Sequence, residues 1–161
     1  MGILVDFTEK GKVKIDMVKY VESMIQDFPV KISKISKTPA AENLLDIGTG
    51  KWLDKARSEA YHTAVAKGLF LCKRSRPDIQ PTIAVLSTRV KSPTESDWKK
   101  LIKMLEYLKR TSKLCLNLKA DNLQVVKWYV DASFAVHPDY RSHTGAVMTL
   151  GKGSIIAMSR K

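Results

Sequence analysis

The sequence predicts an α+β fold, because the spacing of its apolar residues changes twice along the chain of 161 residues. Residues 2–16 alternate apolar and polar side chains around a Glu-Lys-Gly turn, which predicts a β-hairpin. Most of the middle of the chain, up to residue 113, has apolar residues three and four positions apart, as in amphipathic helices. From residue 114 the alternation returns, with short turns between segments, and this predicts a three-stranded antiparallel meander.

The first helix is predicted directly after the hairpin. Asp16 is placed to cap its start, and Pro29 is placed to end it. Residues 29–53 show no sustained period and are predicted to form a long connection. Because a connection of this length is uncommon inside a compact domain, it suggests a functional loop or a surface for a partner.

Three further helices are predicted in the middle of the chain, within residues 54–76, 78–90 and 93–112. The last of them starts with Thr94 and Asp97 in the pattern of a capping box. Its predicted apolar stripe is Trp98, Leu101, Ile102, Leu105 and Leu108. The apolar face predicted for the first of the three is Tyr61, Ala64, Val65, Leu69 and Cys72.

The formal net charge is +12, and its distribution points to a polyanionic partner. Residues 67–113 hold 12 of the 28 Lys and Arg residues but only 4 of the 16 acidic residues. Such a concentration is typical of surfaces that contact nucleic-acid phosphates, although a lysine-rich solvated surface would look the same. Helix phase selects six candidate nucleic-acid contacts, namely Lys73, Arg74, Arg76, Lys99, Lys100 and Lys103.

Composition also bears on location. No apolar run has the length of a membrane span, and the first residues lack the features of a signal peptide, so an intracellular protein is expected. Cys72 and Cys115 are far apart and form no CxxC pair. We expect both to be buried free thiols in a reducing compartment.

Several other motifs in the sequence do not predict a cofactor, metal or catalytic site. The segment "DIGTG", residues 46–50, resembles the glycine-rich turn of nucleotide-dependent methyltransferases, but Trp52 stands at the third glycine position, which favours a plain turn. The three histidines, His62, His137 and His143, share no metal-ligand spacing. Ser133 and Ser142 have no evident base and acid around them, so a hydrolase triad is not predicted.

Asp131 is the residue whose position most needs an explanation. It lies in "WYVDASFAV", an apolar segment that predicts a β-strand. A buried charge is costly unless it is paired or binds a metal. Asp131 is therefore either a water-facing residue on an edge strand or one ligand of a metal site.

Four segments together resemble a known family. They are "YHTAVAKGLFLCKRSRPDI", "AVLSTRV", "SPTESDWKKLIKMLEYLKRT" and "WYVDASFAVHPDYRSHTGAVMTLGKGSIIAMSRK". In this order and spacing they resemble the C-terminal part of a copia-class LTR retrotransposon polyprotein. The resemblance implies that residues 1–113 are the end of a reverse transcriptase palm and its thumb or connection region. Residues 114–161 would be the N-terminal strands of an incomplete RNase H-like domain.

The resemblance also implies roles for the site residues and partners. Asp131 matches the family's first RNase H carboxylate, a Mg²⁺ ligand, whereas Ser133 stands where the family has a second Asp. The later RNase H carboxylates and the polymerase Asp-Asp motif are not in this sequence, so its status as an enzyme stays open. The implied partners are a template–primer duplex, either RNA–DNA or DNA, and the rest of the polyprotein, and the exposed sheet edge would allow self-association. The alternative is a domesticated, non-catalytic nucleic-acid-binding or scaffold protein.

Overall fold

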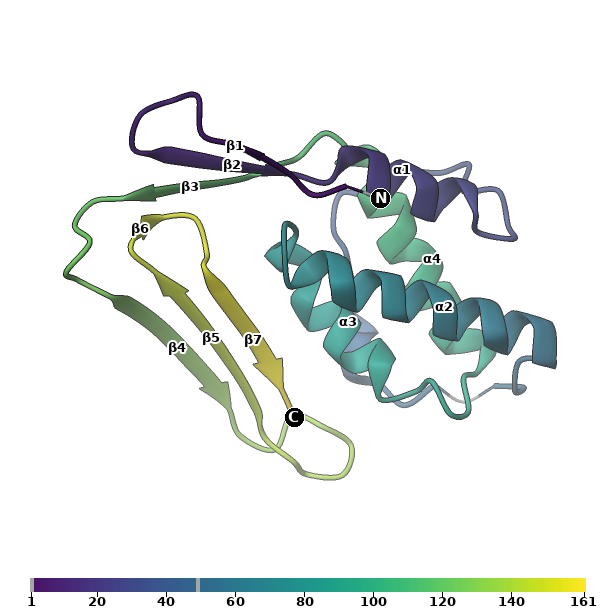
Figure 1. Ribbon diagram of the computed structural model, residues 1–161. Coiled ribbons are helices and arrows are strands. Elements are labelled where there is room, and N and C mark those ends of the chain that lie inside the picture. The colour runs from purple at the N-terminus through teal and green to yellow at the C-terminus, as the bar shows by residue number, and fades with distance from the viewer. Residues whose placement is uncertain (1, 49) are drawn as a thin grey trace.

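The computed structural model describes residues 2–48 and 50–161, and it combines a group of helices with two antiparallel sheets (Figure 1). The α-helices are α1 (Val18–Gln26), α2 (Lys55–Cys72), α3 (Gln80–Ser87) and α4 (Glu95–Arg110). Two short 3₁₀ turns, η1 (Glu42–Leu45) and η2 (Pro77–Ile79), lie in the connections. The predicted α+β fold is confirmed at this level of detail.

The first sheet contains the predicted hairpin, β1 (Leu4–Asp6) and β2 (Lys12–Asp16), which turns at Gly11 with a φ of 76°. It is extended by β3 (Leu116–Ala120), which pairs antiparallel with β2, and by β6 (Gly151–Lys152), which pairs with β3. The pairing of β2 with β3 was not predicted. It joins strands that lie on the two sides of the predicted boundary at residues 113 and 114.

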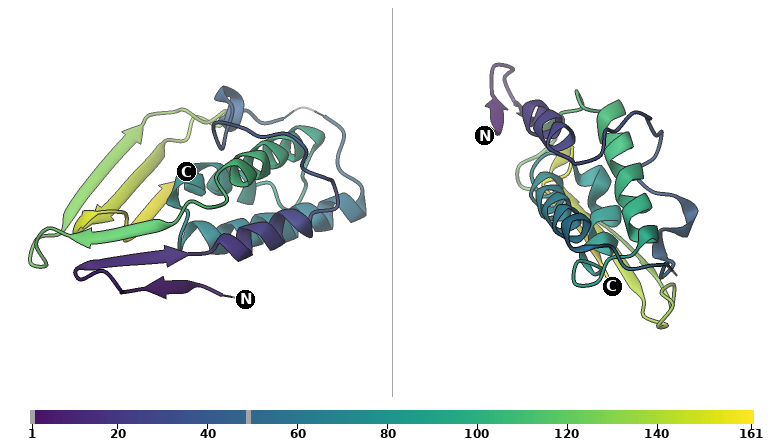
Figure 2. Two further views of the ribbon diagram at one scale, coloured as in Figure 1. Left: turned by 90° about the horizontal axis from the view of Figure 1, so that it is seen from above. Right: turned by 90° about the vertical axis from the view of Figure 1, so that its right-hand side faces the viewer.

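The second sheet is the predicted three-stranded meander. Its strands β4 (Lys127–Ser133), β5 (His143–Thr149) and β7 (Ile156–Arg160) follow one another antiparallel in the order β4-β5-β7. The helices lie on the β7 side of this sheet, where α3 is next to β7 (Figures 1 and 2). The strand β4 is therefore an outer edge of the sheet.

The core lies between the helices and contains residues from all four of them. Its fully buried members include Tyr61, Leu71, Ile83, Leu101, Met104, Leu105 and Leu108. One predicted core residue is wrong, because Leu69 is 36% exposed while Leu71 is fully buried. The stripe of α2 continues through Gly68, where an added Cβ would lie 2.4 Å from Ile83 Cδ1, so glycine allows α2 and α3 to pack closely.

The predicted start signals of two helices are present. At α4, Thr94 and Asp97 form the complete capping box. At α1, the Asp16 carboxylate accepts a hydrogen bond of 2.7 Å from the Val18 N–H, although the boundary residue of the helix is Met17. These local signals were readable in the sequence because each involves residues within three positions of one another.

Residues 29–53 form the predicted long connection, with η1 as its one described turn of helix. The segment 46–50 follows η1 rather than a β-strand, and its Thr49 lies outside the described residues. A glycine-rich cofactor turn needs a strand before it, so the methyltransferase interpretation gains no support. Within the described part of the chain, none of the helices has the length and apolar character needed to cross a membrane.

The two cysteines are free, but only Cys72 is buried, and Cys115 is half-buried, which corrects the prediction for Cys115. Burial raises the pKa of the Cys72 thiol to about 11. The pKa of Cys115 is also raised, mainly by partial burial.

We expect iodoacetamide at pH 8 to alkylate Cys115 on the order of tenfold or more faster than Cys72. At that pH only on the order of one Cys72 thiol in a thousand is thiolate, and that thiol is inaccessible until the protein opens. Peptide mass spectrometry over time measures both rates, and unfolding in urea serves as the control that should make them similar. Equal rates in the native protein would contradict the burial of Cys72.

Candidate nucleic-acid interface and the Asp131 strand

Burial divides the six predicted nucleic-acid contacts into three kinds. Lys73, Arg74 and Lys99 are exposed, and Lys103 is half-buried. Arg76 and Lys100 are buried. Since a phosphate contact needs a cation that solvent can reach, the last two require correction.

Arg76 is a structural residue, with only 1% of its surface exposed. Its Nε and Nη2 donate to the Asp78 carboxylate over 2.8–3.2 Å. Its Nη1 donates to the Thr111 carbonyl at 3.0 Å, and Nη2 also donates to the Thr111 hydroxyl at 2.6 Å. The guanidinium thus links η2 to the end of α4 and is not available to phosphates in this conformation.

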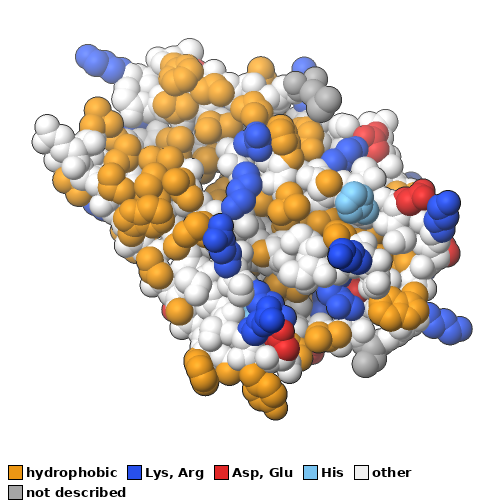
Figure 3. All heavy atoms as spheres, turned by 60° about the horizontal axis from the view of Figure 1, so that its bottom comes forward, with side chains coloured by type: hydrophobic (Ala, Val, Ile, Leu, Met, Phe, Trp, Pro, Cys, Tyr) orange, Lys and Arg blue, Asp and Glu red, His pale blue; other side chains and the backbone are white. Residues whose placement is uncertain are grey.

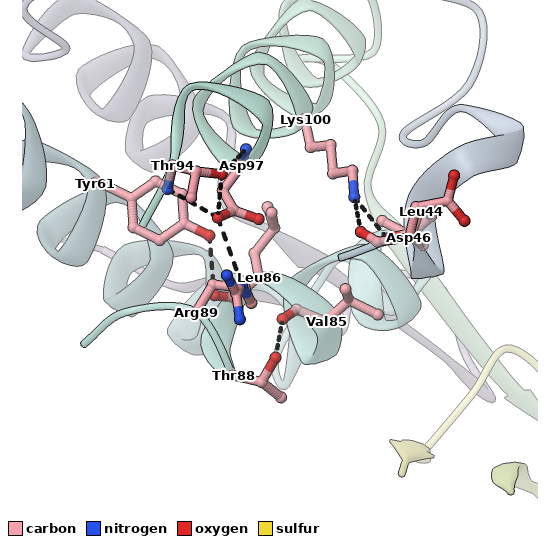
Figure 4. Close-up of polar contacts among 10 residues, drawn as sticks. All are labelled: Leu44, Asp46, Tyr61, Val85, Leu86, Thr88, Arg89, Thr94, Asp97 and Lys100. Atoms are coloured by element: carbon pink, nitrogen blue, oxygen red, sulfur yellow. Dashed lines mark hydrogen bonds and ion pairs between the residues drawn. The ribbon is translucent and has the colours of Figure 1, made fainter. Parts of the chain in front are cut away.

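Lys100 is the second correction, because it is only 8% exposed (Figure 4). Its Nζ donates to the carbonyls of Leu44 and Asp46, at 3.1 and 2.6 Å. Burial lowers its pKa from the ordinary lysine value. Lys100 therefore fastens the long connection to α4, and its position four residues before the buried Met104 places it on the core side of the helix.

The four accessible cations form two pairs. At the end of α2, Lys73 Nζ donates to the Ala157 carbonyl of β7 at 3.1 Å, and the Arg74 guanidinium lies 3.9 Å from the centre of the Phe70 ring. On α4, Lys99 and Lys103 are one helical turn apart. The first pair lies where α2 meets the second sheet. Figure 3 shows a row of Lys and Arg side chains between the helical part and the apolar side chains over the sheets.

Sequence reasoning missed a further structural lysine. Lys109, near the end of α4, donates through Nζ to the Ile32 carbonyl at 2.6 Å. It holds the first part of the long connection, as Lys100 holds the later part. Its position in the last turn of a helix was the only available signal, and that signal indicates helix stabilisation rather than a contact 77 residues away.

Asp131 lies in the middle of β4, opposite Gly145 of β5, and is exposed. Because side chains alternate along a strand, Tyr129, Asp131 and Ser133 share one face. All three line a cleft of about 400 Å³ whose other lining residues include Pro77 of η2 and Gln80, the first residue of α3. Asp131 is therefore a cleft residue on an edge strand.

The described residues place no cluster of metal-ligand side chains around Asp131. Within residues 2–48 and 50–161, no group of three His, Cys, Asp or Glu side chains is arranged to hold a metal ion. A two-metal site needs several carboxylates around the ions, and Asp131 supplies one. The predicted role of Asp131 as a metal ligand stays a prediction about a longer protein.

The chain is similar to two transposon proteins over most or all of its length. It is 23% identical over 163 aligned positions to the putative transposon Ty5-1 protein of Saccharomyces cerevisiae, which covers all of this chain and 52% of the yeast protein. It is 28% identical over 155 positions to the retrovirus-related Pol polyprotein from transposon TNT 1-94 of Nicotiana tabacum, covering 92% of this chain and 12% of that protein. No protein-family model matches the chain, and no solved structure matches it.

These similarities support a retrotransposon polyprotein as the origin of the chain. The chain spans about half the length of the yeast relative and about an eighth of the tobacco polyprotein. The activities and partners of the whole relatives are thus not transferred to it by similarity alone.

Proposed function

We propose that this chain is the part of a retrotransposon polyprotein that connects the end of a reverse transcriptase to the start of an RNase H-like domain. The observation that carries the proposal is the position of Asp131 in the first strand of the antiparallel meander β4-β5-β7. This meander occurs in a chain similar over 92% of its length to a Pol polyprotein. The resemblance of the segments around Asp131 to a copia-class RNase H start supports the same assignment.

In this proposal residues 1–113 contribute the end of the palm and the thumb or connection region, and residues 114–161 begin the RNase H-like domain. The strand β3 follows this boundary yet pairs with β2, so the two regions share one sheet. A shared sheet would keep the thumb-like helices and the meander in a fixed orientation. A fixed orientation of this kind would suit a protein in which one nucleic-acid duplex contacts both the thumb or connection region and the RNase H-like region.

The molecular activity proposed for the chain itself is binding of a template–primer duplex through Lys73, Arg74, Lys99 and Lys103. Phosphate contacts of this kind provide affinity without sequence choice. An RNA–DNA hybrid would be recognised through its backbone and shape. The role of Asp131 as a Mg²⁺ ligand would arise only in a longer polyprotein that supplies further carboxylates, and no RNA-hydrolysing step is assigned to Asp131 among the described residues.

The same proposal accounts for the exposed residues of β4. Trp128, Tyr129 and Val130 are each more than half exposed, on a strand with one unpaired edge. Exposed edges of this kind pair readily with another strand. We propose the rest of the polyprotein as the partner of this edge, with self-association of the isolated chain as the competing outcome.

We expect the affinity for a 20-base-pair RNA–DNA hybrid to fall about a hundredfold between 50 and 200 mM salt, as four phosphate contacts would require. The double variant Lys99→Ala/Lys103→Ala should bind more weakly and should lower the slope of log affinity against log salt by about 2. Fluorescence anisotropy with a labelled hybrid measures both quantities.

The matched control is Lys10→Ala/Lys37→Ala, which removes two exposed lysines from the hairpin turn and the long connection. This control should lower the overall charge equally but leave the salt slope close to that of the unchanged protein. Affinity that did not change between 50 and 200 mM salt would refute nucleic-acid binding through these lysines. Equal slope changes in both double variants would refute the assigned location.

A further inference from the structure

Three polar side chains form a hydrogen-bonded series that the proposed duplex interface does not use. The Ser159 Oγ of β7 lies 2.6 Å from His143 Nε2, and His143 is the first residue of β5. His143 Nδ1 lies 2.9 Å from Nε2 of His137, in the loop between β4 and β5. Sequence reasoning considered Ser133 and Ser142 as nucleophiles, whereas the structure brings Ser159 to the histidines.

We propose that Ser159 is an activated nucleophile of an ester-hydrolysing site, with His143 as its general base and His137 as a positioning residue. An activated serine requires a base within hydrogen-bond reach and a third group that orients the base. His143 has this arrangement, because its Nε2 lies next to the Ser159 hydroxyl and its Nδ1 lies next to His137.

The tautomer that fits this role has hydrogen on Nδ1 of His143. Its Nδ1–H then donates to His137 Nε2, and its Nε2 accepts from the Ser159 hydroxyl. Burial lowers the pKa of His143, and the neighbouring His137 lowers it further. At neutral pH the ring is therefore uncharged and able to take the hydroxyl proton. His137, only 7% exposed, occupies the position that a carboxylate has in the better-known triads.

A cleft gives small molecules access to the nucleophile. Ser159 and His143 line a cleft of about 230 Å³ between the meander and α3, and they also line the larger cleft that contains Asp131. Apolar residues in the smaller cleft include Leu45, Ile47, Leu69, Ala84 and Val85, and its charged residues are Asp46, Arg89, Asp97 and Lys161. These surroundings suit an ester with a short apolar acyl group.

The backbone of β7 offers a donor for the developing oxyanion. The Ala157 carbonyl accepts from Lys73 and so faces away from β5. Main-chain groups alternate in direction along a strand, so the N–H of Ser159 faces the same way. The nucleophile's own N–H is one of the two donors in the chymotrypsin-type oxyanion hole.

The reaction balances without a metal or redox partner. Ser159 Oγ forms a bond to the carbonyl carbon of the ester while its proton moves to His143 Nε2. The bond from that carbon to the alkoxy oxygen breaks, and the alcohol leaves with the proton from His143. Water then attacks the acyl carbon and gives a proton to His143. The bond from that carbon to Ser159 Oγ breaks, Oγ takes the proton back from His143, and the carboxylic acid leaves.

The test treats the full chain with a fluorophosphonate probe and locates the adduct by peptide mass spectrometry. Ser159 should be the labelled residue, and labelling should rise with pH through a single proton loss with a midpoint below about 6.5, the ordinary histidine value. His143→Gln, which keeps a hydrogen-bonding side chain but has no basic nitrogen, should slow labelling on the order of a hundredfold. Ser87→Ala, at the same cleft, should change nothing.

His137→Ala should slow labelling and shift the midpoint of the pH profile upward, and His137→Gln, which keeps an acceptor for His143 Nδ1–H, should restore most of the rate. A merely structural role for His137 would leave the midpoint in place. Thermal melting identifies any variant that fails to fold. If a variant does not fold, the pH dependence of labelling in the unchanged protein tests the proposal instead. Absence of an adduct, labelling spread over several serines, or a rate independent of pH and of His143 would overturn the proposal.

Discussion

Replacing Arg76 by methionine is expected to lower the free energy of unfolding by about 2–3 kcal/mol. The variant keeps an apolar stem of similar length but removes the guanidinium that donates to Asp78 and Thr111. The Asp78 carboxylate would then keep only the Tyr107 hydroxyl as a side-chain donor among the described contacts. Asp78 is half-buried, with 29% of its side chain exposed, so water replaces part of the lost interaction, while the Thr111 carbonyl and hydroxyl lose the donors that Arg76 supplied.

Urea unfolding followed by circular dichroism measures this loss. Arg74→Met is the matched control, because Arg74 is two residues away and exposed, and its loss should be within about 0.5 kcal/mol of zero. The double variant Arg76→Met/Asp78→Leu should be less destabilised than Arg76→Met alone, since it removes both charges of the pair. Equal stabilities of Arg76→Met and Arg74→Met would show that Arg76 is not part of the core.

Arg76 also shows why charge in a sequence does not identify an interface. The segment "KRSR" offers three cations before Pro77, and the one local difference is Asp78, two residues after Arg76, which does not by itself indicate burial. Two remain at the surface, while the third turns inward because Thr111, 35 residues later, provides acceptors there. Whether a cation is buried depends on such distant partners. The approximate total charge of the surface was therefore predictable from the sequence, but not which cations lie on that surface.

The helices were predictable because their signals are local. The capping box at Thr94 and the apolar stripe of α4 involve spacings of three or four residues, and both are present. The apolar face predicted for α2 was partly wrong. Glycine is not counted as apolar when a periodic pattern is sought, although Gly68 lies on the buried face of the helix. Which face of α2 is buried is set here by the close packing of Ile83 against Gly68, and a pattern of apolar residues does not reveal it.

The arrangement of strands was only half predictable. Sequential strands with short turns indicated β4, β5 and β7, which pair in chain order, although the short strand β6 between β5 and β7 pairs with β3 instead. The pairing of β2 with β3 joins residues about 100 positions apart, and no periodicity encodes such a partner. The hydrogen-bonded series of Ser159, His143 and His137 depends in the same way on register, here on Gly145 lying opposite Ser159.

Replacing Asp97 by alanine is expected to lower the free energy of unfolding by about 3 kcal/mol, the larger part from losing a buried carboxylate and the rest from losing a helix cap. Asp97 is 2% exposed, and its Oδ2 accepts from the Thr94 N–H and the Thr94 hydroxyl, each at 2.9 Å (Figure 4). Arg89 Nε lies 3.4 Å from the same oxygen. The variant would leave three donors without their acceptor.

Asp54→Ala provides the comparison, because Asp54 caps α2 by accepting from the Arg57 N–H but is exposed. Its loss should be about 1 kcal/mol, the usual contribution of a helix cap. The difference between the two variants in urea unfolding thus isolates what burial and the Arg89 contact add. If both lost the same free energy, capping alone would explain Asp97. Arg89 would then be free of a structural role and available to a ligand in the cleft beside Ser159.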